Sequence, residues 1–375
     1  MARPASKPKY DHTITREDCD NYYNTVLAAL ALINVLRWDE PGRKLDPDAR
    51  FGVGRRMTTS EKNVVSASTV ITPDVVLQRA GKGVVGEITN SLTENDEYWA
   101  EKLQQVCKYD DSLLGWWTKD EKLPTHDVVL VVPHSRVVRV TDILAKEKSD
   151  EKDTIKFNRH VAVISFHRHS GAAKEYVDLM KFFGDLSDAD LSERLRHGIP
   201  VAQNILLKVY GDRKFVDFPP PMAYVLQIMW DAVFPSYIGE LPIADGANKG
   251  RTPVKVDLDR ICEDLQNNFG FQVDDARGTE VPAKAWIKKA LEHLVIFGMA
   301  SRIDDKTYEV QYRALKGDHV EYFGGQVFKH KGKLDLLGTP LLQPPLPGFG
   351  PPLPVSSPPK SPTIVPDTAK ATPAE

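Results

Sequence analysis

Two short apolar segments joined by a glycine-rich turn each carry one carboxylate. In TPDVVLQRAGKGVVGEITNSL, residues 72–92, Asp74 opens the first segment and Glu87 lies near the end of the second. If the turn closes as a four-residue loop, Asp74 lies opposite Glu87, whereas a slip of one residue sends them to opposite faces. Two carboxylates brought together in this way can bind a divalent ion, which activates water and neutralises charge during phosphodiester hydrolysis. We therefore expect Asp74 and Glu87, with the carbonyl of Ile88, to hold Mg²⁺ or Mn²⁺ if the protein is an enzyme, and no cofactor otherwise.

The segment that follows the hairpin, from Glu94 to about Leu114, has helical periodicity and carries further polar side chains. Gln105 and Tyr109 are four residues apart, so they share a helix face that could orient a phosphate or support the site. Lys102 and Lys108 lie on the same segment, and either could stabilise negative charge in a transition state. Lys82, in the turn, is a poorer candidate for that role.

The order of these elements (helix, hairpin with acids, helix, strand) resembles the core of the PD-(D/E)XK nuclease superfamily. The matching residues are Pro73-Asp74, Glu87-Ile88-Thr89, and Gln105 with Tyr109, which resemble the QxxxY element of RecB-like and Cas4-like members. The resemblance covers about residues 15–170. It implies a restriction-endonuclease-like mixed sheet flanked by helices, hence the α/β (α+β) class, and a metal-dependent nuclease. As partner we expect a nucleic acid, with DNA favoured over RNA and the choice left open.

One position departs from the pattern of that superfamily. Thr89 stands where its members normally have a lysine, and a threonine cannot supply a cation, so Lys102 or Lys108 would have to replace it. The superfamily often has an acid in its first helix as well, for which Glu17 and Glu40 are candidates.

Two other interpretations remain open for the hairpin. Asp74 follows a proline, which is common at the start of a strand, and Glu87 could be a water-facing acid of an edge strand. Alternatively, the fold could be nuclease-like but inactive, and serve as a regulator or adaptor.

The second half of the chain carries a different candidate surface. Residues 220–315 predict three helices and then a two-stranded element, which resembles a winged helix-turn-helix. Basic side chains on the third helix and the predicted wing form a possible phosphate-binding surface: Lys284, Lys288, Lys289, Arg302 and Lys306. A local patch of this kind is needed for nucleic-acid binding because the whole chain has a net charge of −3. Winged helices also dock proteins, and a lysine-rich helix face is commonly only solvated.

Two histidines on a predicted strand offer a further possibility. His167 and His169 alternate in SFHRHSG and so share a face that could bind zinc, but the sequence shows no third ligand nearby. We interpret them as a polar strand end. Together with Arg168 they could contact a phosphate beside the carboxylates.

Hydrophobic periodicity predicts the elements that position these residues. We expect a helix over residues 15–38, buried strands over 127–133 and 160–166 with a charged loop between them, and helical structure over 172–210.

The composition places these elements in an ordinary globular protein. The predicted organisation comprises a disordered N-terminus (1–12), a nuclease-like domain (13–215), a winged-helix-like domain (218–335) and a disordered proline-rich tail (336–375) that could recruit a protein partner. The longest apolar run, residues 26–36, is too short to cross a bilayer, so we expect no membrane partner. Three cysteines without CxxC spacing favour a reducing, cytoplasmic location.

Overall fold

The computed structural model describes most of the chain between residues 12 and 335. The described ranges are 12–37, 49–59, 70–79, 81–110, 112–117, 122–123, 125–149, 160–170, 175–211, 213–238, 250–270 and 281–335. Residues 1–11 and 336–375, which we predicted to be disordered, lie outside these ranges, as does Glu40.

A large mixed sheet forms the centre of the first half of the chain. Within the described residues its seven strands are β1 (Arg50–Val53), β4 (Val75–Arg79), β5 (Lys82–Ile88), β7 (His126–Pro133), β8 (Val161–Ser170), β9 (Glu175–Gly184) and β10 (Ile199–Ala202), in the order β1-β4-β5-β7-β8-β9-β10. β5, β7 and β8 run parallel to one another, and the remaining pairs are antiparallel. The predicted mixed α/β class is therefore confirmed.

The β4–β5 hairpin has the register on which the candidate site depends. Val75 pairs with Gly86 and Arg79 pairs with Lys82, so Asp74 and Glu87 each adjoin the last pair of this ladder. Glycine is required at position 83, because a Cβ there would lie 2.2 Å from the ring of Trp116. The Trp116 ring thus occupies the space that a side chain at position 83 would need.

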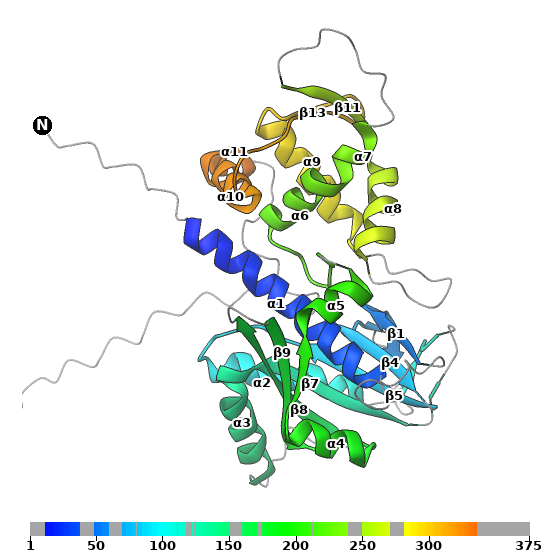
Figure 1. The fold of residues 1–375 in the computed structure, drawn as a ribbon. Coiled ribbons are helices and arrows are strands. Elements are labelled where there is room, and N and C mark those ends of the chain that lie inside the picture. The colour runs from blue at the N-terminus through cyan, green and yellow to red at the C-terminus, as the bar shows by residue number, and fades with distance from the viewer. Residues whose placement is uncertain are drawn as a thin grey trace, which may run out of the picture. The chain divides into compact units, whose positions relative to one another are not determined.

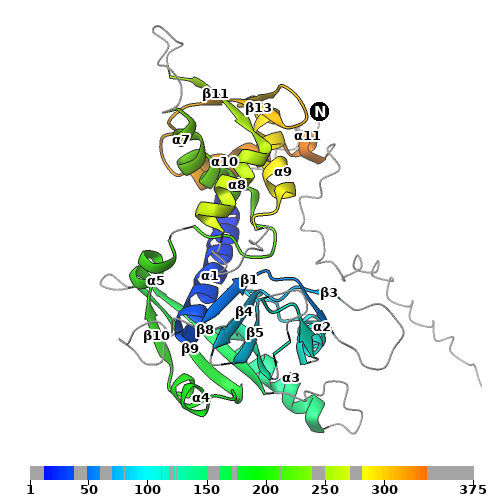
Figure 2. The same ribbon diagram turned by 90° about the vertical axis from the view of Figure 1, so that its right-hand side faces the viewer.

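Helices cover both faces of this sheet (Figures 1 and 2). α1 (His12–Arg37) packs on one face, and α2 (Asp96–Cys107) and α3 (Val137–Ser149) pack on the other. Successive residues of a strand point to opposite faces, so Ile88 joins the core under α1 while Val85 joins the core under α2. Glu87 has the same parity as Val85 and is thereby directed toward α2.

A second, small sheet combines two strands that precede β4 in the chain with one that follows α2. Its strands are β2 (Met57–Thr59), β3 (Val70–Ile71) and β6 (Leu113–Leu114), in the order β3-β2-β6. Two short 3-10 turns, η1 (Lys108–Asp110) and η2 (His134–Arg136), follow α2 and β7.

The second half of the chain contains the three predicted helices and the two-stranded element. In chain order its elements are α6 (Met222–Ile228), the π-helical turn η3 (Met229–Val233), α7 (Phe234–Ile238), β11 (Thr252–Asp257), α8 (Leu258–Phe269), α9 (Lys284–Ile296), β12 (Ala300–Arg302), β13 (Thr307–Tyr312), α10 (His319–Lys329) and α11 (Lys331–Asp335). β11 was not predicted, and it completes an antiparallel sheet of order β11-β13-β12.

The predicted helical structure over 172–210 is wrong for its first half. Residues 175–184 form β9, in which Val177 and Leu179 alternate inward while Glu175 and Phe182 are exposed. This two-residue period is that of a strand pairing with β8. Helices α4 (Ala189–Arg196) and α5 (Gln203–Tyr210) do form later in the segment. Likewise, α3 occupies part of the connection where we predicted a charged loop.

The larger hydrophobic core joins the two halves. It contains residues of α1 and of the sheet, such as Leu30 and Val131, together with Val225, Leu265 and Leu291 from α6, α8 and α9. Within the part of the chain that the structure describes, no helix has the length and apolar character needed to span a bilayer.

Candidate active site

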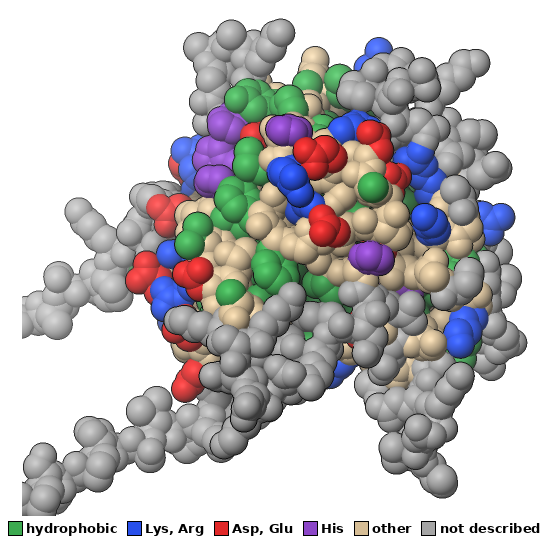
Figure 3. Space-filling model, turned by 90° about the horizontal axis from the view of Figure 1, so that it is seen from below, with side chains coloured by type: hydrophobic (Ala, Val, Ile, Leu, Met, Phe, Trp, Pro, Cys, Tyr) green, Lys and Arg blue, Asp and Glu red, His purple; other side chains and the backbone are tan. Residues whose placement is uncertain are grey.

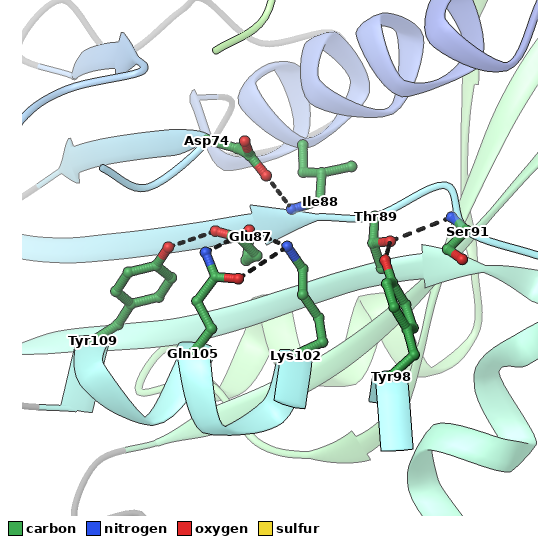
Figure 4. Close-up of polar contacts among 9 residues, drawn as sticks. All are labelled: Asp74, Glu87, Ile88, Thr89, Ser91, Tyr98, Lys102, Gln105 and Tyr109. Carbon is green, nitrogen blue, oxygen red and sulfur yellow. Dashed lines mark hydrogen bonds and ion pairs between the residues drawn. The ribbon is translucent and has the colours of Figure 1, made fainter. Parts of the chain in front are cut away.

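Glu87 is the centre of a connected group of polar side chains at the end of β5. Tyr109 Oη donates a hydrogen bond to Glu87 Oε2 at 2.5 Å, and Gln105 Nε2 donates to Oε1 at 3.4 Å. Lys102 Nζ forms an ion pair with the same Oε1 (Figure 4). Four of the predicted site residues are thus in contact, because α2 presents Lys102, Gln105 and the following Tyr109 on the face that covers β5.

This group is buried. Glu87 is 3% exposed, Lys102 7% and Tyr109 1%. Burial alone would lower the pKa of Lys102, but the carboxylates of Glu87 and Asp74 beside it raise that pKa, so the ammonium stays charged. Burial and the Glu87 charge raise the pKa of Tyr109 well above its ordinary value, so its hydroxyl remains a donor.

Asp74 approaches β5 from the side opposite α2. In Figure 4 its carboxylate lies on the side of β5 that faces α1, whereas Glu87 is contacted by side chains from α2. Asp74 Oδ2 accepts a hydrogen bond from the amide of Ile88 at 2.7 Å. Burial and the Glu87 charge raise the pKa of Asp74 well above its ordinary value. We predicted the carbonyl of Ile88 as a metal ligand; the contact that the structure shows is made by its amide.

Of the two lysines proposed to replace the one missing at Thr89, the structure brings Lys102 to Glu87. Lys108 is exposed at the start of η1 and Lys82 is exposed at the start of β5. Six residues separate Lys102 from Lys108, which is not a whole number of helical turns, so the two side chains leave the helix in different directions. Glu17 is exposed on α1.

Thr89, which stands at the position of the missing lysine, contacts Tyr98 and not Glu87 in the described hydrogen bonds. Its hydroxyl lies 3.1 Å from Tyr98 Oη and accepts a hydrogen bond from the Ser91 amide at 3.2 Å. Tyr98 was not predicted as a site residue. Its place one helical turn before Lys102 is the signal that could have identified it.

The donor set partly suits a magnesium or manganese ion. Neighbouring carboxylates are the oxygen donors that such a hard cation prefers. However, both oxygens of Glu87 already accept hydrogen bonds from protein donors. Among the described residues, no set of three or more His, Cys, Asp and Glu side chains is arranged to hold a metal ion. Binding of a cation therefore requires Lys102 to share or release Glu87.

His134 lies beside the two histidines that the sequence singled out, His167 and His169, and was not predicted to do so. The ring centroids of His134, on η2, and His167 are 6.1 Å apart, and those of His167 and His169 are 4.3 Å apart. Tyr176 stacks on His169 at 4.3 Å. Arg168 does not join them, because it contacts Glu175 and Asn24 on the other side of the strand. In the view of Figure 3, histidine side chains gather beside hydrophobic ones, while basic and acidic side chains are interspersed elsewhere on the described surface.

The predicted phosphate-binding surface is less positive than its sequence indicates. Lys284 and Lys306 both pair with Asp259, the latter at 2.7 Å, and these contacts lower the pKa of Asp259 to about 2. Arg302 pairs with Asp305. Lys288 is exposed, and burial lowers the pKa of the half-buried Lys289. Exposed ion pairs are weak, so these cations are held loosely by neighbouring acids.

Comparisons of the chain with protein family models, curated proteins and solved structures give no match. Functional inference for this chain therefore depends on the geometry described above.

Proposed function

We propose that the chain is a nucleic-acid-binding protein of nuclease-like fold whose Asp74–Glu87 site hydrolyses phosphodiester bonds with Mg²⁺ or Mn²⁺. The observation that carries the proposal is the connected group of Glu87, Lys102, Gln105 and Tyr109, with Asp74 beside it. The succession of α1, three antiparallel strands, α2 and the parallel strand β7 supports the resemblance to the PD-(D/E)XK superfamily.

Each side chain has a role in this proposal. Asp74 and Glu87 would hold the cation, which when bound activates water and neutralises phosphate charge. Lys102 lies at the Glu87 end of the site, where its ammonium can stabilise negative charge on the phosphate. Tyr109 and Gln105 hold the Glu87 carboxylate in one orientation.

The C-terminal elements supply the proposed binding surface. The order of α6, β11, α8, α9, β12 and β13 supports the winged-helix resemblance, and α9 carries the exposed Lys288 and the surface-paired Lys284. DNA phosphates could replace Asp259 as the partner of Lys284 and Lys306, because exposed pairs exchange at little cost.

A second function, nucleic-acid binding without hydrolysis, is supported by one specific observation. Lys102 already provides the positive charge beside Glu87, and protein donors occupy both Glu87 oxygens. A site closed in this way could have kept the fold and lost the metal.

The test is cleavage of plasmid and of single-stranded DNA by the full chain, with and without Mg²⁺ or Mn²⁺. Glu87→Gln removes the central charge, and Asp190→Asn makes the same kind of change at an exposed position of α4. Metal-dependent cleavage that is lost only in Glu87→Gln supports hydrolysis. Binding that weakens with salt but leads to no cleavage supports the second function. If neither binding nor cleavage occurs, both proposals are wrong, and a protein-interaction role through the proline-rich tail becomes the better hypothesis.

A further inference from the structure

Five ring-bearing side chains of η2, β8 and β9 form a continuous row, which we call the ring row. In spatial order they are Phe182, His134, His167, His169 and Tyr176, and consecutive ring centroids lie 5.5, 6.1, 4.3 and 4.3 Å apart. The first three side chains are exposed and the last two are half-buried. Histidine side chains gather at the surface in Figure 3. The row therefore offers aromatic surface to a ligand from solvent.

Strand register and one buried serine set the positions of these rings. Ser165, His167 and His169 alternate along β8 and so share one face of the sheet. His169 pairs across the ladder with Tyr176 of β9. His134 directly follows β7, and its Nδ1 atom lies 3.2 Å from the hydroxyl of the buried Ser165. The row is thus held by the sheet itself.

The ring row lies at the same edge of the sheet as the Glu87 site. β5, β7 and β8 run parallel, so their carboxyl ends meet at one edge. Glu87 is next to the end of β5, His134 follows the end of β7, and His169 is next to the end of β8. Ligands of open α/β sheets bind at this edge. A polymer bound along it would contact both the rings and the Glu87 site.

Two arginines beside His134 extend toward the start of α2. Arg136 NH1 contacts Glu94 Oε1 at 3.2 Å, and Arg139 Nε contacts Asp96 Oδ1 at 2.6 Å. Both carboxylates are largely exposed, so these ion pairs are weak. Phosphate oxygens can replace the carboxylates as partners of the two guanidinium groups.

The central ring of the row is uncharged at neutral pH. Burial and two neighbouring histidines lower the pKa of His167, and Asp178, its partner across the ladder, opposes this effect. His167 therefore presents a neutral aromatic ring. The three histidines do not form a metal site, since no set of three or more His, Cys, Asp and Glu side chains in the described ranges is arranged to hold an ion.

We propose that the ring row binds single-stranded nucleic acid by stacking with its bases, while Arg136 and Arg139 contact its phosphates. Unpaired bases have free faces that stack on aromatic rings, whereas a duplex hides these faces. The exposed rings are 5.5 and 6.1 Å apart, wider than the rise of about 3.4 Å per base in a duplex strand, so the row suits an extended strand. The inference rests on the proposed function and deepens it, since it names single strands as the class of substrate.

The test is fluorescence anisotropy of the full chain with a labelled poly-dT strand of about twelve nucleotides. His167→Ala and Phe182→Ala each remove one exposed ring. His197→Ala, at the end of α4, and Phe328→Ala, on α10, remove matched exposed rings elsewhere. We expect the dissociation constant to rise at least about fivefold in each of the first two variants and to stay unchanged in the two controls. His167→Phe, which keeps a ring without the imidazole, should bind like the wild type.

A strand of equal length made of abasic nucleotides separates stacking from charge, because it carries the same phosphates without bases. It should bind the wild-type chain at least about tenfold more weakly than poly-dT. Equal affinity for the two strands would overturn the proposal, because the phosphates alone would then account for binding. This comparison uses only the wild-type chain, so it decides even if a variant does not fold, which circular dichroism would show.

The outcomes separate this inference from the proposed function. Wild-type affinity for poly-dT in both ring variants, or binding of duplex DNA without binding of single strands, overturns the inference and leaves the proposed function standing. A synthetic peptide of residues 341–354, taken from the proline-rich segment, tests a protein ligand. Binding of this peptide that depends on the rings, without such binding of poly-dT, also overturns the proposal. Ring-dependent binding of poly-dT without any cleavage supports the inference, while the hydrolytic function fails.

Discussion

The Glu87 site and the lysine surface of α9 are both built from ion pairs, but in opposite surroundings. At the Glu87 site, Lys102 and its partner are almost fully buried, and Tyr109 and Gln105 hold the same carboxylate. On α9, the side chains of Lys284 and Asp259 are 50% and 46% exposed, and Asp259 is shared with Lys306. Removing one member of a buried pair leaves a charge without solvent, whereas an exposed charge is hydrated again at once.

The comparison teaches that the two regions respond to different perturbations. The buried site should control stability and any chemistry, since each of its groups depends on the others. The exposed surface should control association with polyanions, since its lysines can change partners freely.

The largest effect is expected from Lys102→Met, which keeps the side-chain volume but leaves Glu87 buried without its cation. The free energy of unfolding should fall by about 3–5 kcal/mol. Lys108→Met is the matched control, because it changes the exposed lysine beside α2 and should leave stability almost unchanged. Urea denaturation of the two variants measures the difference. Equal loss in both would mean that the buried pair has no special importance.

A smaller loss is expected from Tyr109→Phe, which removes the hydroxyl that donates to Glu87 Oε2. A hydrogen bond to a buried charged group contributes about 1.5–3 kcal/mol, so the urea midpoint should fall accordingly. Tyr98→Phe, which removes a half-buried hydroxyl on the same helix, should have a lesser effect. The reverse ranking would contradict the central position given to Glu87.

Acid pH should destabilise the chain through His293, which is buried in α9. Burial lowers the pKa of His293 to about 4 from its ordinary value of 6.5. The unfolded chain therefore binds a proton that the folded chain does not, and stability is lost as the pH falls from about 6.5 to 4. We expect this part of the loss to be about 3 kcal/mol, and to be absent in His293→Gln but kept in His197→Gln, which alters an exposed histidine. Thermal unfolding at several pH values measures it.

The smallest effect on stability, but a clear one on binding, is expected from Asp259→Asn. This change frees Lys284 and Lys306, so affinity for DNA or heparin should rise and depend more steeply on salt. Asp190→Asn changes the net charge equally without releasing a lysine. If both variants gain affinity to the same extent, only the net charge matters and the α9 surface is not the binding site.

The β4–β5 hairpin and the polar face of α2 could be predicted because each depends on residues close together in the sequence. The glycine-rich turn fixes a register in which both acids adjoin the last pair of the hairpin, although the Asp74 carboxylate lies on the α1 side of β5. Helical spacing brings Lys102, Gln105 and Tyr109 to one face. The same spacing favours Lys102 over Lys108 as the lysine on the Gln105–Tyr109 face.

Other features depend on contacts between distant parts of the chain. β9 was predicted as helical because its buried Lys181 and exposed Phe182 obscure the alternation of a strand. The salt bridge of Lys306 likewise arises because the start of β13 lies beside the start of α8, and that of Lys284 because α9 packs against α8.

The shared core under α1 has a practical consequence for dissecting the molecule. Buried residues of this helix belong to the same apolar cluster as those of α6, α8 and α9, and Arg16 pairs with Asp318 at the start of α10. A fragment that begins after residue 37 would lack α1. The apolar surfaces that α1 covers on both halves would then be exposed to solvent, so the fragment should tend to aggregate. Point variants of the intact chain are therefore the safer way to test the two proposed activities separately.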